Sequence, residues 1–435
     1  MLPIMISVLF APFLLYGAYK RSLFTLNFLL CLCIFQNIML VLISPHIDSI
    51  GYNILVLIKE IFVFLTIVFG LIHKPKIGRM DGYCIVCILL LLISSLVYGS
   101  GTMRQILVSL RQLYLPFVFY LFARQIYISE SDFIKFTKFF VSLCVVCSMF
   151  GVLELMVGDS FWEKLNYRNY SLIKIGTIQI VNGHYNSVAM YSYDLYFIVH
   201  KMLKRMSSLL VDPVILAQIL ALGTLFLFFV KNLVRYQKAC FVLVAISLVI
   251  TFGKGGIIIA TLAGAYLIKA IYHQKQVANF LIIVGINAVV FAVIYSLNHG
   301  LSGEAHIQGL MDYVRRLPRY PFGSGIGAAG NIAIWMGGLD TDLSGESFVG
   351  TVIGQMGIGI IIYFVFAVKL YKDTKSKLHY CKMTNEILTV TNIATVAMFL
   401  TSFINNTTIS FTSCFIYFIL LGVRIEKVSE VSRKS

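Results

Sequence analysis

The chain of 435 residues is dominated by apolar side chains, since 59% of its residues are hydrophobic and only 12% are charged. A soluble domain carries about 25% charged residues, and a soluble core of this length could not bury so much apolar surface. The composition therefore excludes an ordinary soluble protein and predicts a membrane protein. The formal net charge of +16 does not indicate nucleic-acid binding, because the basic residues lie mostly in short loops between apolar runs.

Apolar runs of about 17–25 residues predict membrane-spanning helices. Together they predict an all-α, polytopic membrane protein with about 12–14 spans that forms a single transmembrane domain over residues 1–435. In chain order the thirteen expected spans are 2–18, 22–43, 51–72, 83–99, 105–123, 134–157, 213–230, 238–252, 256–272, 278–296, 347–368, 387–404 and 409–423.

Basic residues in the short loops predict the orientation of these spans. Clusters such as Lys20-Arg21 and the group from Lys369 to Lys382 fall on one side, which we expect to be cytoplasmic. Counting thirteen spans places the C-terminus inside and the N-terminus outside. Two long loops, residues 158–212 and 297–346, then lie on the outer side. Because long loops in compact folds tend to carry function, we expect the site there.

Cations on the outer side depart from the charge rule, which predicts few of them there. Arg111 lies seven residues after Arg104, so both can share one helix face, and it lies inside the membrane, where a charge is costly and usually functional. Guanidinium groups bind phosphate oxygens bidentately, which makes phosphate the natural ligand. For Lys164 and Lys201 we favour snorkelling to lipid headgroups. The outer cations that we assign to a phosphate site are Arg104, Arg111, Arg205, Lys254, Arg315, Arg316 and Arg319.

The loop 297–346 also holds the candidate acidic residues. Glu346 opens the following span, where it could act as a helix cap or as a general base beside the arginines, and both interpretations stay open. Asp340 and Asp342 could hold a metal, although we expect none. Loop histidines are more often solvated than catalytic, which is how we interpret His184, His299 and His306.

Two glycine-rich segments do not match nucleotide-binding motifs. Gly325, Gly327 and Gly330 spell GxGxxG but lack the βαβ unit of a dinucleotide site, so we expect them to let the backbone turn close to a ligand or the membrane surface. The turn TFGKGG at 251–256 lacks the spacing of a P-loop. Without an ATP signature or a cofactor motif, the energy for any chemistry must come from the substrate, and no cofactor is expected.

Four segments in order resemble the Wzy-type O-antigen polymerases and, more distantly, the O-antigen ligases. They are RQLYLPFVFYLFAR at 111–124, KRMSSLLVDPVILAQIL at 204–220, TFGKGG at 251–256, and RRLPRYPFGSGIG followed by GESFVGTVIGQMGIGI within 315–360. The third segment has Lys254 where the family has arginine. The resemblance covers roughly residues 100–370.

The resemblance implies a helical, metal-independent glycosyltransferase fold of the GT-C-like type. The implied substrate is an oligosaccharide repeat unit on undecaprenyl diphosphate, with membrane lipids and a chain-length regulator protein as further partners. The implied place is a bacterial inner membrane, with the site facing the periplasm. We expect Glu346, Arg316 and Arg319 to be catalytic, with Glu346 as the base. The residues expected to bind the diphosphate are Arg104, Arg111, Arg205, Lys254 and Arg315.

Other functions remain open at this point. Ligases carry a His-Asn pair where this chain has Glu346-Ser347, which favours a polymerase over a ligase. A flippase or another transporter should show repeat symmetry and charges near the membrane midplane. Lys59, Glu60 and Arg111 are intramembrane charges, but most of the unexpected cations lie in outer loops. A scaffold without catalytic function would have little need for Arg111.

Overall fold

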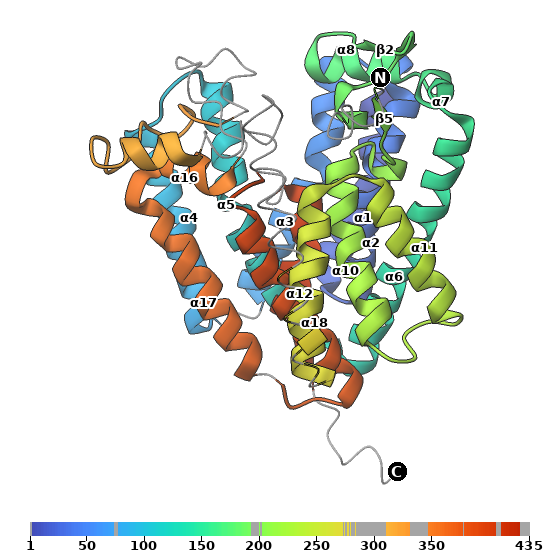
Figure 1. Cartoon of the computed structure of the whole chain (residues 1–435). Helices are drawn as coiled ribbons and strands as arrows, with labels where there is room; N and C mark the ends of the chain where they lie inside the picture. The colour runs from blue at the N-terminus through green and yellow to red at the C-terminus, as the bar shows by residue number, and fades with distance from the viewer. Residues whose placement is uncertain are drawn as a thin grey trace.

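The chain folds mainly into helices that run along a common direction (Figure 1). The computed structural model describes residues 2–73, 77–192, 200, 202–272, 274, 276–277, 279, 283, 310–330, 347–376, 378–405 and 410–426. Within these residues, eight helices are long and apolar enough to cross a membrane. The protein is therefore a multi-pass, mostly α-helical membrane protein.

The helices follow the expected spans closely. Every expected span except 278–296 overlaps an observed helix, and 278–296 lies almost entirely outside the described residues. The long helices are α1 (Leu2–Lys20), α2 (Leu23–Ile43), α3 (Ser49–His73), α4 (Arg79–Val97), α5 (Met103–Arg124), α6 (Glu130–Val157), α10 (Pro213–Phe229), α11 (Gln237–Ile250), α12 (Lys254–Tyr272), α17 (Ile361–Ser376), α18 (Lys382–Thr401) and α19 (Phe411–Gly422).

Short elements lie mainly in the connections. The helical ones are η1 (Ser44–His46), α7 (Ser160–Lys164), α8 (Tyr167–Ile175), η2 (Val188–Met190), η3 (Ser208–Leu210), α16 (Phe348–Met356) and η5 (Gly357–Ile360). Three two-stranded pairs depart from the all-α expectation. They are β1 (Tyr127–Ser129) parallel to β6 (Arg424–Glu426), and the antiparallel pairs β2 (Ile180–Val181) with β3 (His184–Tyr185) and β4 (Tyr191–Ser192) with β5 (Leu203–Lys204).

Helix starts are fixed by caps that are visible in the sequence. The Asp212 carboxylate accepts hydrogen bonds from Val214 N and Ile215 N, at 2.8 and 3.0 Å, and Pro213 occupies the first turn of α10. At the start of α5, Thr102 and Gln105 form a capping box. These local signals place α10 and α5 within two residues of the expected spans.

The span expected at 347–368 is not one continuous helix. It ends as α16 at Met356, turns through Gly357 with φ +56°, and continues through η5 into α17. The backbone of Pro321 occupies the break, because Ile358 N donates to Pro321 O at 2.8 Å. A Cβ on Gly357 would lie 1.9 Å from that oxygen, so only glycine fits.

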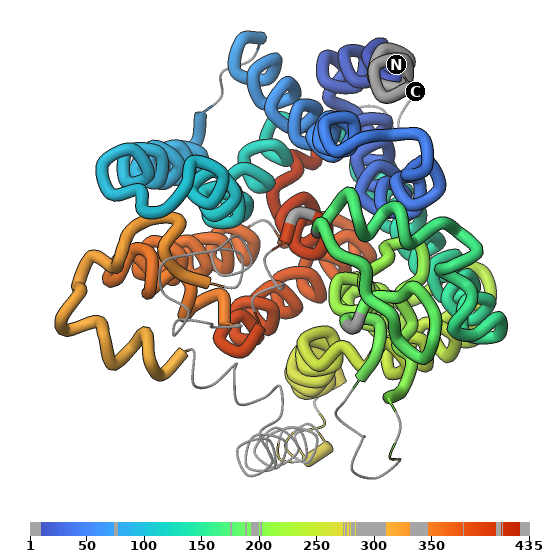
Figure 2. Tube along the Cα trace, turned by 90° about the horizontal axis from the view of Figure 1, so that it is seen from above, coloured from blue at the N-terminus to red at the C-terminus, as the bar shows by residue number. Residues whose placement is uncertain are grey.

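α19 lies near the centre of the bundle, where it packs against α5, α18 and α10 (Figure 2). Its side chains from Thr412 to Leu421 are all buried. A helix that is apolar all round is expected in such a position, because it presents no face to water. α10 is similarly buried and packs against α11 and α12.

The two ends of the bundle differ in charge and structure. We call the end that carries α7, α8 and α16 the loop end, at the top of Figure 1, and the other the opposite end. At the opposite end, Asp81 is 2% exposed and accepts hydrogen bonds from Arg124 at 3.0 Å and Arg424 at 3.2 Å. Together with the β1–β6 pair, this cluster ties the start of α4 to the end of α5 and to the C-terminal strand.

Candidate functional site

The most buried charges among the candidate residues form an ion pair within the membrane-spanning helices. Arg111 Nη2 on α5 lies 2.6 Å from Glu60 Oε1 on α3. The Glu60 side chain is 9% exposed and that of Arg111 is 31% exposed. At a rise of about 1.5 Å per residue, both lie roughly 12–17 Å below the loop-end starts of their helices. An intramembrane charge of this kind is by default a functional-site candidate.

Lys59 makes this site cationic rather than neutral. Its side chain is buried beside Glu60, and it lies within electrostatic range of Arg111 and of Lys174 on α8. Two cations, Lys59 and Arg111, thus lie near one buried carboxylate. Because the single carboxylate of Glu60 balances only one of these two positive charges, the cluster is a favourable place for a further anion.

Tyrosine side chains border the same cluster. Tyr114 lies within electrostatic range of Glu60 and Arg111. The rings of Tyr52 and Tyr170 meet edge to face, with centroids 6.1 Å apart, at the contact between α3 and α8. A phenolic hydroxyl can donate to a phosphate or a sugar oxygen, so these side chains suit a ligand that carries both.

The segment 320–330 carries the glycines and follows the three clustered arginines. Ser100 N donates to Ile326 O at 2.9 Å and Ile326 N donates to Tyr98 O at 3.2 Å, which joins this segment to the connection between α4 and α5. Gly325 has φ +102°, and a Cβ there would meet Tyr98 O at 2.2 Å. Gly325 therefore lies against the protein's own backbone at the α4–α5 connection, while the expected approach to a ligand or the membrane surface stays a prediction.

The candidate arginines near these two joined segments differ in exposure. Arg104 follows the α4–α5 connection directly, and it is exposed at the loop end. Arg315 and Arg319 are also exposed, with Arg315 3.6 Å from Asp312, while Arg316 is half-buried. These cations thus lie at the loop end, with Arg104 at the α4–α5 connection and the other three on the segment that precedes residues 320–330.

Tyr313 anchors the arginine-bearing segment to α16. Its side chain is buried, and its hydroxyl accepts a hydrogen bond from Gly330 N at 3.0 Å. A Cβ on Gly354 of α16 would meet the Tyr313 ring at 2.3 Å, so the ring lies directly on that helix. The arginines are therefore carried by a packed segment whose position is set by a buried ring.

Arg205 has a different environment from the one expected. Its Nε donates to Thr251 O at 2.8 Å, Nη2 to Phe252 O at 3.3 Å and Nη1 to Ala189 O at 3.3 Å. These carbonyls belong to the turn that precedes Lys254 and to η2. The contacts give Arg205 a positioning role for that turn, while its expected contact with a diphosphate remains a prediction.

Lys254 is the exposed first residue of α12, in a turn that packs tightly on neighbouring helices. A Cβ on Gly256 would meet Ala217 O of α10 at 2.3 Å, and one on Gly255 would meet the Asn405 side chain at 2.5 Å. The glycines on this turn thus permit close helix packing, which fixes Lys254 at the loop end.

The loop end of α18 connects this turn to α16. Ser402 O accepts a hydrogen bond from Val349 N at 3.1 Å, and Asn405, three residues further on, lies beside Gly255.

Glu346 lies outside the described residues, as do Asp340, Asp342, His299 and His306. Its neighbour Ser347 is the N-cap of α16, because Gly350 N donates to Ser347 Oγ at 2.9 Å. The cap position considered for Glu346 is therefore taken by Ser347.

The end of α6 holds an acidic residue that was not a candidate from the sequence. Glu154 is fully buried and accepts hydrogen bonds from Trp162 Nε1 at 2.7 Å and from the backbone N–H groups of Ser207 and Ser208 at 3.0 and 2.7 Å. These bonds fasten α7 and η3 to the end of α6. Each oxygen of Glu154 has a donor, so this carboxylate is structural.

Lys204 belongs to the same loop and lies beside Asp159. Burial lowers the pKa of its amino group, although the nearby carboxylates of Glu154 and Asp159 oppose that effect. Closer to the surface, His184 Nδ1 lies 2.6 Å from Glu163 Oε2, with both side chains 37% exposed. The pairing of His184 could not be read from the sequence because Glu163 lies 21 residues away.

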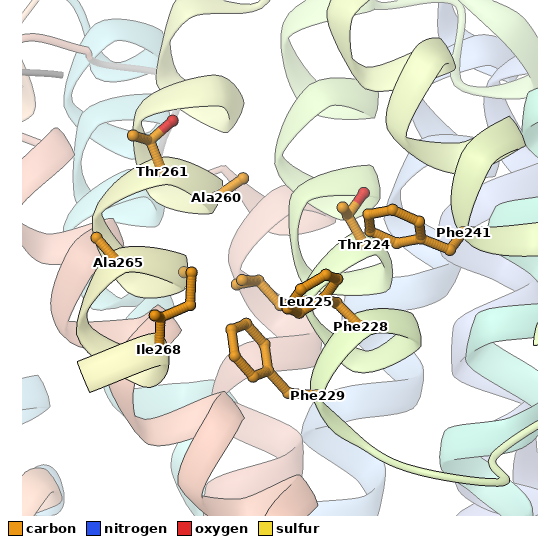
Figure 3. A pocket seen from close by; sticks show the side chains of 10 residues that line it. Thr224, Leu225, Phe228, Phe229, Phe241, Ala260, Thr261, Ala265 and Ile268 are labelled. Carbon is orange, nitrogen blue, oxygen red and sulfur yellow. The ribbon is translucent and has the colours of Figure 1, made fainter. Parts of the chain in front are cut away.

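A groove also lies between α10, α11 and α12 (Figure 3). It has a volume of about 220 Å³ and is lined mainly by apolar side chains, among them Leu225, Phe229, Phe241 and Ile268.

Within the described residues, no three His, Cys, Asp or Glu side chains gather in a way that could hold a metal ion.

No protein-family model matches the chain, and no curated protein is similar to it.

Proposed function

We propose that the chain is a polymerase that joins oligosaccharide repeat units carried on undecaprenyl diphosphate, at the outer face of a bacterial inner membrane. The observation that carries this proposal is the buried cluster of Lys59, Glu60 and Arg111. It offers more positive than negative charge within the membrane-spanning helices, where ionisable side chains are functional-site candidates. Free sugars and neutral lipids would leave this charge unused.

The loop-end arginines would extend the same site toward water. Arg104 and the group Arg315, Arg316 and Arg319 all lie at the loop end, and in this proposal they bind the diphosphate together with Arg111. Guanidinium groups suit this task because they bind phosphate oxygens bidentately. The surface saccharide would then lie among the loops, and the polyprenyl chain among the helices.

In the proposed reaction an acceptor hydroxyl attacks the anomeric carbon of the donor sugar. A new carbon–oxygen bond forms, and the bond from the anomeric carbon to the phosphate oxygen breaks, with its electron pair leaving on the diphosphate. The arginines stabilise that developing charge. The proton of the hydroxyl passes to a base, for which Glu346 is our candidate. Undecaprenyl diphosphate is released, and the growing chain resides on the acceptor unit.

A lipid-linked oligosaccharide flippase is the second candidate. Two observations favour it: the ion pair lies within the spans, and α16 and α17 form a helix broken at Gly357. Broken helices and intramembrane charges are typical of transporters. An O-antigen ligase would use the same donor but pass it to a different acceptor. The three functions differ in product, which makes them separable by experiment.

The polymerase is tested with purified chain, reconstituted into liposomes and given undecaprenyl-diphosphate-linked repeat units. We expect a ladder of chain lengths, reduced by about 100-fold in Arg111→Ala, Arg316→Ala and Glu346→Gln. Arg235→Ala is the matched control, because Arg235 is an exposed arginine at the opposite end. Normal ladders from all three site variants would refute the assignment.

A further inference from the structure

Helices α10, α11 and α12 lie in a stretch of the chain that carries no negative side chain. From residue 213 to residue 303 the sequence contains no Asp or Glu. Lys231 and Lys238 flank the turn between α10 and α11, and Lys269 lies in the last turn of α12, so all three are at the opposite end. Each is exposed, and none forms an ion pair with a described residue. This surface therefore carries a positive charge that no carboxylate of its own segment balances.

Tyrosine side chains place these lysines at the boundary between membrane and water. Tyr236 is 70% exposed in the same turn, and Tyr272, which is 42% exposed, ends α12. Exposed tyrosines are typical of the headgroup level of a bilayer, where the ring is apolar and the hydroxyl meets water. The guanidinium of Arg235 is already engaged in this turn, because it lies over the Tyr236 ring, 4.8 Å from its centroid. The lysines are therefore level with lipid headgroups.

The apolar groove between α10, α11 and α12 lies next to these lysines. α10 and α12 are in contact near the loop end, where a Cβ on Gly256 would meet Ala217 O at 2.3 Å. Further along α12, a Cβ on Gly264 would touch only Leu225 Cδ2, at an ordinary contact distance of 3.7 Å. The two helices therefore separate toward the opposite end, and Figure 3 shows the space between them.

Two of the lysines lie one helical turn from residues that line the groove. Lys269 follows Ala265 by four residues on α12, and Lys238 precedes Phe241 by three residues on α11, so each pair shares a helix face. Lys231 lies just past the end of α10, the third helix of the groove. Amino groups from all three helices thus surround the end of the groove that faces the opposite end of the bundle.

The depth of the groove matches the hydrocarbon half of one leaflet. The hydrocarbon core of a bilayer is about 30 Å thick, so each leaflet contributes about 15 Å. At a rise of about 1.5 Å per residue, the α12 lining from Ile268 to Ala260 extends roughly 2–14 Å from Lys269. The hydroxyls of Thr224 and Thr261 on the lining donate within their own helices. An acyl chain of that leaflet fits this space, whereas a polar ligand would find no partner in it.

We propose that this surface binds an anionic phospholipid of the leaflet at the opposite end, which the loop charges predict to be the cytoplasmic one. The phosphate lies among Lys231, Lys238 and Lys269, and one acyl chain fills the space where α10 and α12 separate. Lysines next to membrane helices attract anionic lipids, which supply the negative charge that this segment lacks. The proposal does not depend on the polymerase, because the proposed reaction takes place at the loop end.

The test is binding of phosphatidylglycerol to the purified full chain in detergent micelles, measured by native mass spectrometry. Lys238→Gln combined with Lys269→Gln should weaken binding of the first lipid by about tenfold or more, since each lysine near an anionic lipid contributes about a factor of five. The matched control is Lys372→Gln combined with Lys375→Gln. These two are exposed lysines of α17, at the same end but on another side of the bundle (Figure 1), and this variant should bind like the wild type.

Two further arms test the headgroup and the groove. Phosphatidylcholine has the same chains but no net charge, so it should bind the wild type more weakly than phosphatidylglycerol, and the Lys238/Lys269 variant should lose most of this preference. Gly264→Leu fills the groove and should weaken binding of phosphatidylglycerol. Gly82→Leu on α4 is its control, because a Cβ there would meet nothing within 4 Å. Gly264→Ala repeats the test with a side chain that fits, in case the leucine variant does not fold.

Three results would overturn the proposal. Equal weakening by the two lysine pairs would mean that only the general charge of this end attracts the lipid. Equal binding of the two lipids by the wild type would remove the role of the lysines. Unchanged binding by folded Gly264 variants would remove the groove from the site.

Discussion

At the scale of single residues, the pairing of charges decides what each candidate can do. Arg111 was identifiable from the sequence as an intramembrane cation, but its partner Glu60 lies 51 residues earlier in the chain, on another helix. Arg205 and Lys254 look alike as outer cations in the sequence. The structure distinguishes them, because the guanidinium of Arg205 donates to three backbone carbonyls while Lys254 lies exposed at the start of α12. Partners that are distant in sequence cannot be derived from local pattern alone.

The Glu60–Arg111 pair predicts a coupling between two substitutions. Removing one partner leaves an uncompensated charge among the helices, so Glu60→Gln and Arg111→Gln should each destabilise the fold by about 2 kcal/mol. This loss is smaller than for a fully buried ion pair, because the Arg111 side chain is partly exposed. The double variant should lose less than the sum of the two. Unfolding measured by steric trapping in bicelles gives these free energies. Purely additive losses would mean that the two side chains do not stabilise each other.

At the scale of elements, helix bodies were predictable and their interruptions were not. The apolar runs and caps such as Asp212-Pro213 locate α10 and its neighbours because both signals are local. The break between α16 and α17 depends on the backbone of Pro321, which lies 36 residues before Gly357. The glycines of the 320–330 segment indicated a turn in the sequence, but their contact with the α4–α5 connection is a tertiary feature.

The position of the 320–330 segment should depend on Gly325. Gly325→Ala places a Cβ 2.2 Å from Tyr98 O at a φ of +102°, so it should destabilise the fold by about 1–3 kcal/mol and displace the neighbouring arginines. Gly82→Ala, at an open helical position, should be neutral or slightly stabilising. Thermal unfolding in detergent compares the two variants. Equal melting temperatures would contradict the packed position of Gly325.

The cluster at the opposite end predicts a strong effect of one carboxylate. Asp81→Asn leaves Arg124 and Arg424 without their shared counter-ion, and it should destabilise the protein by about 3 kcal/mol. Because Arg424 belongs to β6, the C-terminal strand should also become more accessible to protease. Limited proteolysis of the purified chain, compared with Asp132→Asn at an exposed ion pair, measures this effect. Unchanged cleavage after Asp81→Asn would show that the cluster does not hold the strand.

At the scale of the whole molecule, composition and charge predicted a multi-pass helical membrane protein, and the structure shows one. Loop topology alone also predicted that the outer cations gather at one end. In the structure, Arg104, Lys254, the Arg315–Arg319 group and Ser347 all lie at the loop end. Contacts made by residues 98–102, Ser402 and Asn405 hold the segments of this end together. What the sequence could not supply is the arrangement of these contacts, because each joins residues far apart in the chain.

The expected orientation can be measured with thiol labelling. Cys381 is exposed at the opposite end, and Phe322, which is 71% exposed, lies at the loop end. A membrane-impermeant maleimide added to intact spheroplasts should label Phe322→Cys in a Cys381→Ser background, but not Cys381 in the natural chain. Permeabilised cells should label both. Labelling of Cys381 from outside would reverse the assigned faces and remove the loop end from the outer surface.

The most direct test of the account is the stoichiometry of the proposed reaction. The purified chain in liposomes is given only undecaprenyl-diphosphate-linked repeat units. It should release one undecaprenyl diphosphate for each new glycosidic bond while a ladder of polymer forms. Arg111→Gln should suppress both the lipid release and the polymer ladder. Units that cross the bilayer without being joined, or a wild-type protein that yields neither ladder nor released lipid, would contradict the assignment of this membrane protein as a polysaccharide polymerase.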